Sequence, residues 1–295
     1  MNETNTLGSV YRYLIRELSL SKIENPQLEA RILLAFASGV KQTRIIGYPE
    51  DKLDNSIISN LEKIMARRKT GEPIAYITGV KEFWSLNFNV TKETLIPRPD
   101  SETIVQSVLD TITNHMDRIS ILDLGTGSGC LLLALLSELP KAIGVGIDIS
   151  SRSCKIAKKN AKELGLNNRA KFYQGNWMEG IHDQFDIIVT NPPYVAEPDM
   201  EFLDREIRLF EPHLALSGGP DGVAAYRLIA KESITRLKTA GILVVEIGIN
   251  QAQSIRDIFV QNGLKIIKTQ RDFSNIDRCI LATVEHSSII SEIKV

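Results

Sequence analysis

The chain has 295 residues, of which 43% are hydrophobic and 24% are charged, and its formal net charge is −1 at pH 7. This composition is typical of a soluble globular protein with one large domain or two of ordinary size. The small net charge excludes an overall positive field that would draw the whole protein onto nucleic acid.

Cysteine usage and hydropathy favour a cytoplasmic protein. Cys130, Cys154 and Cys279 form no CxxC pair, so we expect reduced thiols and no bound metal. The most apolar stretch, residues 130–136, is far too short to span a bilayer. The first ten residues lack the basic and apolar segments of a secretory signal, and we expect no membrane segment.

The first part of the chain, residues 1–75, is expected to form a small helical bundle. Apolar residues recur at helical spacing in three segments, residues 6–18, 25–39 and 54–71. The basic run "ARRK" (66–69) is a candidate surface patch, but we interpret it as the solvated end of a helix, near the negative pole of its dipole.

Residues 76–98 follow the helical segments and are expected to form a linker with a different residue pattern. Within it "FWSLNFNV" (83–90) alternates as a strand does, and a proline-stiffened connector comes next. Helical and strand patterns then alternate over residues 99–286, which predicts an α/β domain with a mainly parallel sheet covered on both faces. Residues 287–295 are expected to be a tail.

A glycine-rich loop lies between the first strand of this domain and the next helix, in "ILDLGTGSGC". It contains Gly125, Gly127 and Gly129, which allow a tight bend and bring a ligand against bare N–H groups at a helix N-terminus. Asp148 ends the following strand, where a carboxylate can accept hydrogen bonds from both hydroxyls of a ribose. An ordinary tight turn and a simple helix cap are the alternatives for the loop and for Asp148.

The spacing of these glycines limits the class of ligand that the loop is expected to bind. It is GxGxG, not the GxGxxG of dinucleotide binding, and no Gly-Lys-Ser/Thr phosphate loop is present. This favours an adenosine-containing ligand without phosphates, of which S-adenosylmethionine is one.

A second motif, Asn191-Pro192-Pro193-Tyr194, ends the strand in "IIVTNPPY". Neither proline can donate a backbone hydrogen bond, so the strand stops there and exposes an amide, a carbonyl and an aromatic face. An ordinary Asn-Pro turn is the alternative. Ligands of open α/β sheets bind at the carboxyl ends of the strands, so both motifs are expected at one crevice.

Taken together, "LDLGTGSG", "NPPY", "TGVKEFWSL", "LIPRPDSE" and "FEPHLALSGGPDG" resemble the HemK/PrmC family over about residues 5–286. The resemblance implies a methyltransferase that uses S-adenosylmethionine and modifies the glutamine of the GGQ motif in peptide-chain release factors. It also implies a Rossmann-like domain with a seven-stranded, mainly parallel sheet, a β-hairpin linker, and an N-terminal helical domain that recognises the substrate.

The resemblance further assigns roles to individual residues. The cofactor would be held by the glycine loop, by Asp148, by Asn191 and by Trp177, which would flank the adenine unless it is a core tryptophan at a strand end; the loop residues are Gly125, Thr126, Gly127, Ser128 and Gly129. Where relatives often carry Asp before the tryptophan, this chain has Asn176, whose carbonyl can still accept a hydrogen bond. The glutamine would be received by Asn191, Pro192, Pro193 and Tyr194, and the pocket mouth would be lined by Pro97 and Arg98.

The chemistry of methyl transfer to an amide suits this turn. The target amide has two N–H donors, for which the Asn191 side-chain oxygen and the Pro192 carbonyl are the expected acceptors, while Tyr194 stacks on the amide plane. These three are the candidate catalytic residues. We assign no general base, because the methylated nitrogen is acidic enough to lose its proton unaided, and we interpret His182 and His213 as surface residues.

Two other functions fit the same motifs. A DNA or RNA adenine methyltransferase faces an amine with the same two donors, and a non-catalytic adenosine-binding module would need only the glycine loop. The acidic pI of about 6.5 and the lack of a basic, aromatic-rich recognition domain argue against the first. We therefore expect a monomer that acts on release factors without binding nucleic acid directly.

Overall fold

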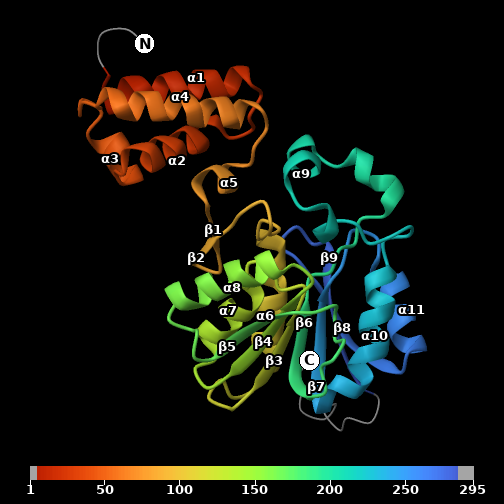
Figure 1. The fold of residues 1–295 in the computed structure, drawn as a ribbon. Coiled ribbons are helices and arrows are strands. Elements are labelled where there is room, and N and C mark those ends of the chain that lie inside the picture. The colour runs from red at the N-terminus through yellow and green to blue at the C-terminus, as the bar shows by residue number, and fades with distance from the viewer. Residues whose placement is uncertain (1–4, 285–295) are drawn as a thin grey trace. The chain divides into compact units, whose positions relative to one another are not determined.

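The computed structural model describes residues 5–284, so the expected tail at 287–295 lies outside the described residues. Contacts divide the chain between Gly79 and Val80 into two compact units. Figure 1 shows the smaller unit in red and orange and the larger unit in yellow to blue.

The smaller unit consists of helices around one core. The helices are α1 (Leu7–Leu20), α2 (Pro26–Ser38), α3 (Gln42–Gly47), α4 (Asn55–Lys69) and α5 (Ile74–Thr78). Leu14, Leu18, Leu33 and Leu34 are fully buried in this core, which fits the apolar spacing of α1 and α2. The helical bundle that the sequence predicts is present.

The basic run 66–69 at the end of α4 differs from its interpretation as a solvated helix end. Arg68 is only 3% exposed, and its guanidinium bonds both carboxylate oxygens of Glu29 on α2 at 2.6 and 3.1 Å. Arg67 pairs with Glu72 at 2.8 Å. The interpretation is wrong for Arg68 because an acidic partner on another helix draws it inward.

The larger unit begins with an antiparallel hairpin of β1 (Val80–Phe83) and β2 (Leu86–Asn89). The strand expected over 83–90 is therefore interrupted: Trp84 and Ser85 have φ of 53° and 57° and form the turn. The rings of Phe83 and Phe88 meet edge to face at 6.2 Å within the core of this unit. The hairpin thus packs as part of the larger unit.

A seven-stranded sheet is the centre of the larger unit. Its order is β5-β4-β3-β6-β7-β9-β8, and all neighbours are parallel except the two pairs that include β9. The strands are β3 (Ser120–Leu124), β4 (Ile143–Asp148), β5 (Ala170–Gln174), β6 (Phe185–Thr190), β7 (Leu237–Glu246), β8 (Leu264–Arg271) and β9 (Asp277–Val284). The expected α/β fold with a mainly parallel seven-stranded sheet is confirmed.

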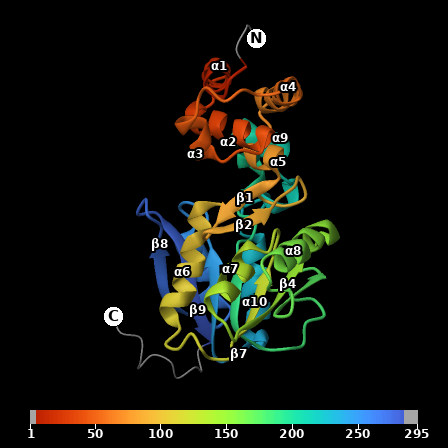
Figure 2. The same ribbon diagram turned by 90° about the vertical axis from the view of Figure 1, so that its left-hand side faces the viewer.

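Helices cover both faces of this sheet (Figures 1 and 2). One face packs against α6 (Glu102–Thr111), α7 (Cys130–Glu138) and α8 (Ser151–Glu163). The other packs against α10 (Ala224–Arg236) and α11 (Ala252–Gln261). Most side chains of the central strands β3 and β6 are buried because both faces are covered, which explains their nearly continuous apolar runs.

The connection from β6 to α10 is long and carries short helical turns: η2 (Glu197–Phe202), α9 (Arg205–Phe210) and η3 (His213–Ala215). A further turn, η1 (Pro99–Ser101), precedes α6. Among the described residues, no helix combines the length and the apolar character needed to cross a membrane.

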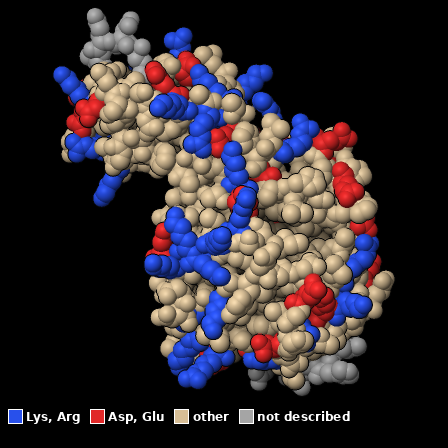
Figure 3. Space-filling view, in the orientation of Figure 1, with Lys and Arg blue, Asp and Glu red and all other residues tan. Residues whose placement is uncertain are grey.

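Basic side chains gather over α8, on the left of the larger unit in Figure 3. Its exposed basic residues are Arg152, Lys155, Lys158, Lys159 and Lys162. A locally basic surface therefore exists on a chain whose net charge is close to zero.

Candidate active site

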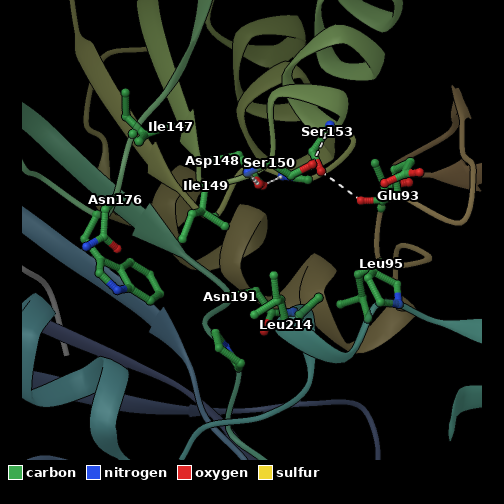
Figure 4. A pocket seen from close by; sticks show the side chains of 18 residues that line it. Glu93, Leu95, Ile147, Asp148, Ile149, Ser150, Ser153, Asn176, Asn191 and Leu214 are labelled. Atoms are coloured by element: carbon green, nitrogen blue, oxygen red, sulfur yellow. Dashed lines mark hydrogen bonds between the residues drawn. The ribbon is translucent and has the colours of Figure 1, made fainter.

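A cavity of about 270 Å³ lies at the carboxyl ends of the central strands. In the view of Figure 4, Asn176 is on the left, Glu93 and Leu95 are on the right, and Asn191 and Leu214 lie between them. Its lining consists of Glu93, Thr94, Leu95, Gly125, Gly127, Ile147, Asp148, Ile149, Ser150, Ser153, Gly175, Asn176, Trp177, Asn191, Pro193, Pro212, Leu214 and Ala215. The glycine loop and the Asn-Pro turn thus meet at one crevice, as the sequence predicts.

The glycine loop has a backbone that only glycine adopts easily. Gly125, Gly127 and Gly129 have φ of 67°, 54° and 82°, all in the left-handed region. A Cβ on Gly129 would also approach Ala157 and Leu133 to 3.2 Å. The loop therefore brings backbone, without side chains, to the cavity beside the N-terminus of α7.

Asp148 holds this loop through backbone hydrogen bonds. Its Oδ2 accepts the Gly127 N–H and its Oδ1 accepts the Ser150 N–H, both at 2.8 Å (the latter dashed in Figure 4). Burial raises the pKa of Asp148, and these two backbone donors act against that rise. The side-chain cap of α8 is Ser150, which accepts from Ser153 N, so Asp148 is not the helix cap itself.

Thr126 and Ser128 belong to the loop, but both are buried and neither lines the cavity. The Thr126 hydroxyl donates to Asp123 Oδ2 at 2.6 Å, and the Thr126 N–H bonds the Ile147 carbonyl at 2.9 Å. Burial raises the pKa of Asp123 to about 7, against the effect of the Thr126 hydrogen bond.

Trp177 and Asn176 form a wall of the cavity near the end of β5. Trp177 has φ of 50°, is partly exposed, and packs against the core on the α10 and α11 side of the sheet. Trp177 therefore contacts both the core and the cavity, and its place beside the adenine stays a prediction.

The Asn191–Tyr194 turn is fixed at the level of its backbone. Gln251 Nε2 donates to the Tyr194 carbonyl at 2.9 Å. A Cβ on Gly218 would come within 2.8 Å of the Pro193 carbonyl, and one on Gly222 within 2.6 Å of the Tyr194 carbonyl. Gly218 and Gly222 of "SGGPDG" are thus required by close approach to this turn.

Within the turn, Asn191 and Pro193 line the cavity, whereas Pro192 is buried and Tyr194 packs partly on the core. Among the described residues, none donates a hydrogen bond to Asn191 Oδ1 or to the Pro192 carbonyl. Asn191 therefore lines the cavity, and neither its Oδ1 nor the carbonyl of the next residue, Pro192, has a donor in this part of the chain.

Pro97 and Arg98 do not line the cavity. Pro97 is buried, and the Arg98 guanidinium pairs with Glu211, which also accepts the Ile96 N–H at 3.2 Å. Glu211 thereby ties the connector to the segment before η3, and both segments contribute wall residues. The placement of Pro97 and Arg98 at the mouth of the bound complex stays a prediction.

The hydrogen-bond partners of Asn191 were not predicted from the sequence. Its Nδ2 donates to the Ser101 hydroxyl at 3.0 Å, and Ser101 donates to Glu246. Ser101 lies in "LIPRPDSE", and Glu246 ends the apolar strand "GILVVE". An acidic residue at the end of the apolar run 241–245 was the sequence signal that could have identified Glu246 as a functional residue.

The donor set of the cavity indicates the kind of ligand that it suits. The described lining includes the carboxylates of Glu93 and Asp148, bare backbone and one indole ring, but no lysine or arginine. Such a site fits a cationic nucleoside better than a phosphate ester. Within residues 5–284 there is also no group of three or more His, Cys, Asp or Glu side chains placed to hold a metal ion.

Two domain families match this chain. Residues 9–79 match the PrmC N-terminal domain, and residues 101–219 match the methyltransferase small domain. The first match lies within the helical unit and the second includes the glycine loop, Asp148 and the Asn191–Tyr194 turn.

Relatives match along nearly the whole chain. A release factor glutamine methyltransferase of Caulobacter vibrioides is 43% identical over 279 residues, covering 94% of this chain and 96% of the relative. One from Aliivibrio fischeri is 38% identical, with the same two coverages.

Solved structures support the fold alone. The hMettl16 catalytic domain, solved with a MAT2A 3'UTR hairpin, aligns with a TM-score of 0.56 at 18% identity, covering 76% of this chain and 83% of that one. A methyltransferase from Pyrococcus furiosus aligns with a TM-score of 0.50 at 14% identity, covering 76% and 98%.

Proposed function

The chain belongs to the release factor glutamine methyltransferase family, and we propose that it methylates the side-chain amide nitrogen of the glutamine in the GGQ motif of peptide-chain release factors. The observation that carries this proposal is a pair of neighbouring acceptors without donors among the described residues, Asn191 Oδ1 and the Pro192 carbonyl, in the turn whose Asn191 and Pro193 line the cavity. An amide NH₂ group is the ligand that two such acceptors match.

The methyl donor would be S-adenosylmethionine, whose sulfonium supplies an activated methyl group and leaves as neutral S-adenosylhomocysteine. Asp148 would accept the ribose hydroxyls with the lone pairs that its two backbone donors leave free. The backbone of Gly125 and Gly127 would contact the cofactor, and Trp177 would lie against its adenine. The carboxylates and the missing cationic side chains in the lining are the support for this fit.

The contribution of the chain to the reaction is orientation. An amide nitrogen is a weak nucleophile because its lone pair is delocalised into the carbonyl. Holding both N–H groups, on Asn191 Oδ1 and on the Pro192 carbonyl, turns the nitrogen toward the methyl group, and orientation of this kind supplies up to roughly 7–11 kcal/mol. Pro193 and Tyr194 would complete the contact, with the Tyr194 ring stacked on the amide plane.

A methylation assay tests the proposal. Purified protein is mixed with S-adenosylmethionine and with either an intact release factor or DNA, and the products are read by peptide mass and by nucleoside analysis. We expect the added methyl group on the GGQ glutamine alone. Methylated adenine with an unmodified release factor would instead identify a nucleic-acid methyltransferase. Calorimetric binding of S-adenosylmethionine without any methyl transfer would identify a non-catalytic binding module.

The helical unit would recognise the protein substrate, because a cavity that fits a side-chain amide gives no reason for a second unit. A truncated chain that begins near Thr78 should bind S-adenosylmethionine with unchanged affinity, since the whole lining lies beyond this residue. It should methylate the intact release factor poorly. Full activity on the intact factor would contradict this role. The monomeric state, the cytoplasmic location and the lack of direct nucleic-acid binding stay predictions.

A further inference from the structure

A buried hydroxyl and a buried carboxylate lie directly behind Asn191. Ser101 is 3% exposed and lies at the end of η1, where α6 begins. Glu246 is 1% exposed and is the last residue of β7. Since β6 and β7 are parallel neighbours with Thr190 opposite Val245, Asn191 and Glu246 both lie at the same edge of the sheet.

The hydrogen bonds among these three residues run in one direction. Asn191 Nδ2 donates to Ser101 Oγ at 3.0 Å, and the Ser101 hydroxyl donates to Glu246 Oε2. An ionised carboxylate can only accept, so it commits the single hydroxyl proton of Ser101. The Ser101 oxygen then has only lone pairs to offer, and the group of Asn191 that faces it must be the NH₂.

We propose that Glu246 and Ser101 are positioning residues that fix the orientation of the Asn191 amide, so that its oxygen and not its NH₂ faces the target amide. This inference deepens the proposed function and rests on it. The reacting atoms would touch neither residue; both act through Asn191.

Loss of the negative charge of Glu246 would remove this constraint on the Asn191 amide. When Glu246 is neutral, the Ser101 hydroxyl is no longer committed and can donate to Asn191 Oδ1 instead. The Asn191 amide can then rotate by half a turn and present its NH₂ to the cavity. Two donors would face each other at the target nitrogen, so the amide would lose one acceptor and its alignment.

The ionisation state of Glu246 therefore determines the orientation of the Asn191 amide. Burial raises the pKa of Glu246 to about 7, while the Ser101 and Asn191 hydrogen bonds and the charge of Arg278 act against the rise. Other ionisable groups also act on it or are acted on by it; they are Asp100 on η1, Tyr194 after β6, Tyr226 on α10, Cys130 on α7, and Cys279 and Arg278 on β9. Because the carboxylate is the form that commits Ser101, turnover should rise as the pH passes upward through about 7.

Steady-state kinetics of Ser101→Ala and Glu246→Gln test the proposal. We expect kcat on the release factor to fall at least tenfold in both variants, with the affinity for S-adenosylmethionine changed less than about twofold. Ser101→Thr keeps the hydroxyl and should recover most of the lost turnover. In Glu246→Gln, and in Ser101→Ala, the rise of kcat around pH 7 should disappear.

Ser233→Ala is the matched control. Ser233 is a fully buried serine on α10, outside the cavity, whose hydroxyl has no hydrogen-bond partner among the described residues. Its substitution should leave kcat and the pH profile unchanged. If Ser233→Ala lowered kcat as much as Ser101→Ala, the loss would reflect burial alone and the proposal would fail.

A spectroscopic measurement gives a readout that does not depend on turnover. The side-chain ¹⁵N–¹H signals of Asn191, assigned by their loss in Asn191→Asp, should shift with a midpoint near pH 7 in the otherwise unaltered protein. They should not titrate in Glu246→Gln.

The outcomes also separate this inference from the proposed function. An unaltered protein that methylates the release factor, together with full turnover in Ser101→Ala and Glu246→Gln, would overturn the positioning role alone. If the unaltered protein failed to methylate the factor, the proposed function would fail, and a pH-independent Asn191 signal would then overturn the inference as well.

Discussion

At the Asp148 end of the cavity, hydrogen bonds join residues that are close in the sequence. Asp148 accepts from Ser150, two positions away, and from Gly127, 21 positions away, across neighbouring strands. At the Asn191 end the bonds span much longer stretches. Asn191 reaches Ser101 over 90 positions, and Ser101 reaches Glu246 over 145.

Because of this difference, substitutions at the two ends of the cavity should affect different properties of the protein. The Asp148 end is completed by two adjacent strands and the loops that follow them, so substitutions there should change ligand affinity and little else. The Asn191 end requires η1, β6 and β7 together. Substitutions there should change turnover while the Asp148 end still binds its ligand.

The largest effect is expected for Asn191→Ala. The change removes one of two acceptors for the target amide, and the unpaired donor costs about 1–3 kcal/mol, to which lost alignment adds. We expect kcat to fall by about tenfold to a hundredfold or more, with a smaller change in S-adenosylmethionine affinity. Asn262→Ala, at the end of α11 and outside the cavity lining, is the control. A normal turnover number in Asn191→Ala would leave the motif as an ordinary turn.

Asp148→Ala should produce the converse result. Hydrogen bonds to a charged acceptor contribute about 1.5–3 kcal/mol each, so the dissociation constant of S-adenosylmethionine should rise at least tenfold. Calorimetry measures this directly, and kcat at saturating cofactor should be affected less than in Asn191→Ala. Unchanged affinity would exclude the assignment of Asp148 to the ribose.

The buried carboxyl beneath the glycine loop predicts a pH-dependent stability. Because burial raises the pKa of Asp123 from 3.8 to about 7, the folded state favours the protonated form. This contribution to stability is complete below about pH 4 and is lost as the pH rises through about 7. Between pH 5 and 8 the free energy of unfolding should fall by roughly 2–3 kcal/mol from this group.

Urea unfolding of Asp123→Asn at pH 5 and pH 8 tests the sign. The variant lacks the titrating group, so its stability relative to the unaltered protein should improve from pH 5 to pH 8. A relative stability that stays constant or worsens over this range would show that Asp123 is ionised throughout.

The smallest effect is expected for Tyr194→Phe. The Tyr194 hydroxyl has no hydrogen-bond partner among the described residues, and burial raises the pKa of Tyr194 to about 12, so it stays neutral at working pH. If the ring acts by stacking on the target amide, kcat should change less than about threefold in Tyr194→Phe but fall strongly in Tyr194→Ala. Equal losses in both variants would assign the role to the hydroxyl instead.

The comparison also shows what the sequence could predict. Local signals, such as apolar periodicity, the three glycines and the two prolines, were enough to place the helices, the sheet and both motifs at one crevice. The residue pattern did not locate the hairpin turn at Trp84 and Ser85, because both have positive φ and neither is the Asn, Asp or Gly that usually adopts it in a two-residue hairpin turn.

The sequence could not predict hydrogen-bond and ion-pair partners that meet only in the tertiary structure. Arg68 continues the inward spacing of Leu61 and Met65 on α4, but its partner Glu29 lies 39 positions away and has no signal in the sequence. The residues that do form an exposed basic surface, on α8, were predicted only as part of the alternating helices and strands of residues 99–286. In the same way, Ser101 and Glu246 meet Asn191 only after strands far apart in the sequence become neighbours.

The position of β9 has a consequence for the synthesis of this protein. The last strand of the described chain lies inside the sheet, between β7 and β8, and carries Arg278, whose charge acts on Glu246. A nascent chain that has emerged only as far as β8 therefore has a gap in its sheet beside β7. The sheet is therefore complete only after the segment up to Val284 has left the ribosome, so premature termination upstream of β9 should yield fragments with an incomplete sheet that cellular proteases can remove.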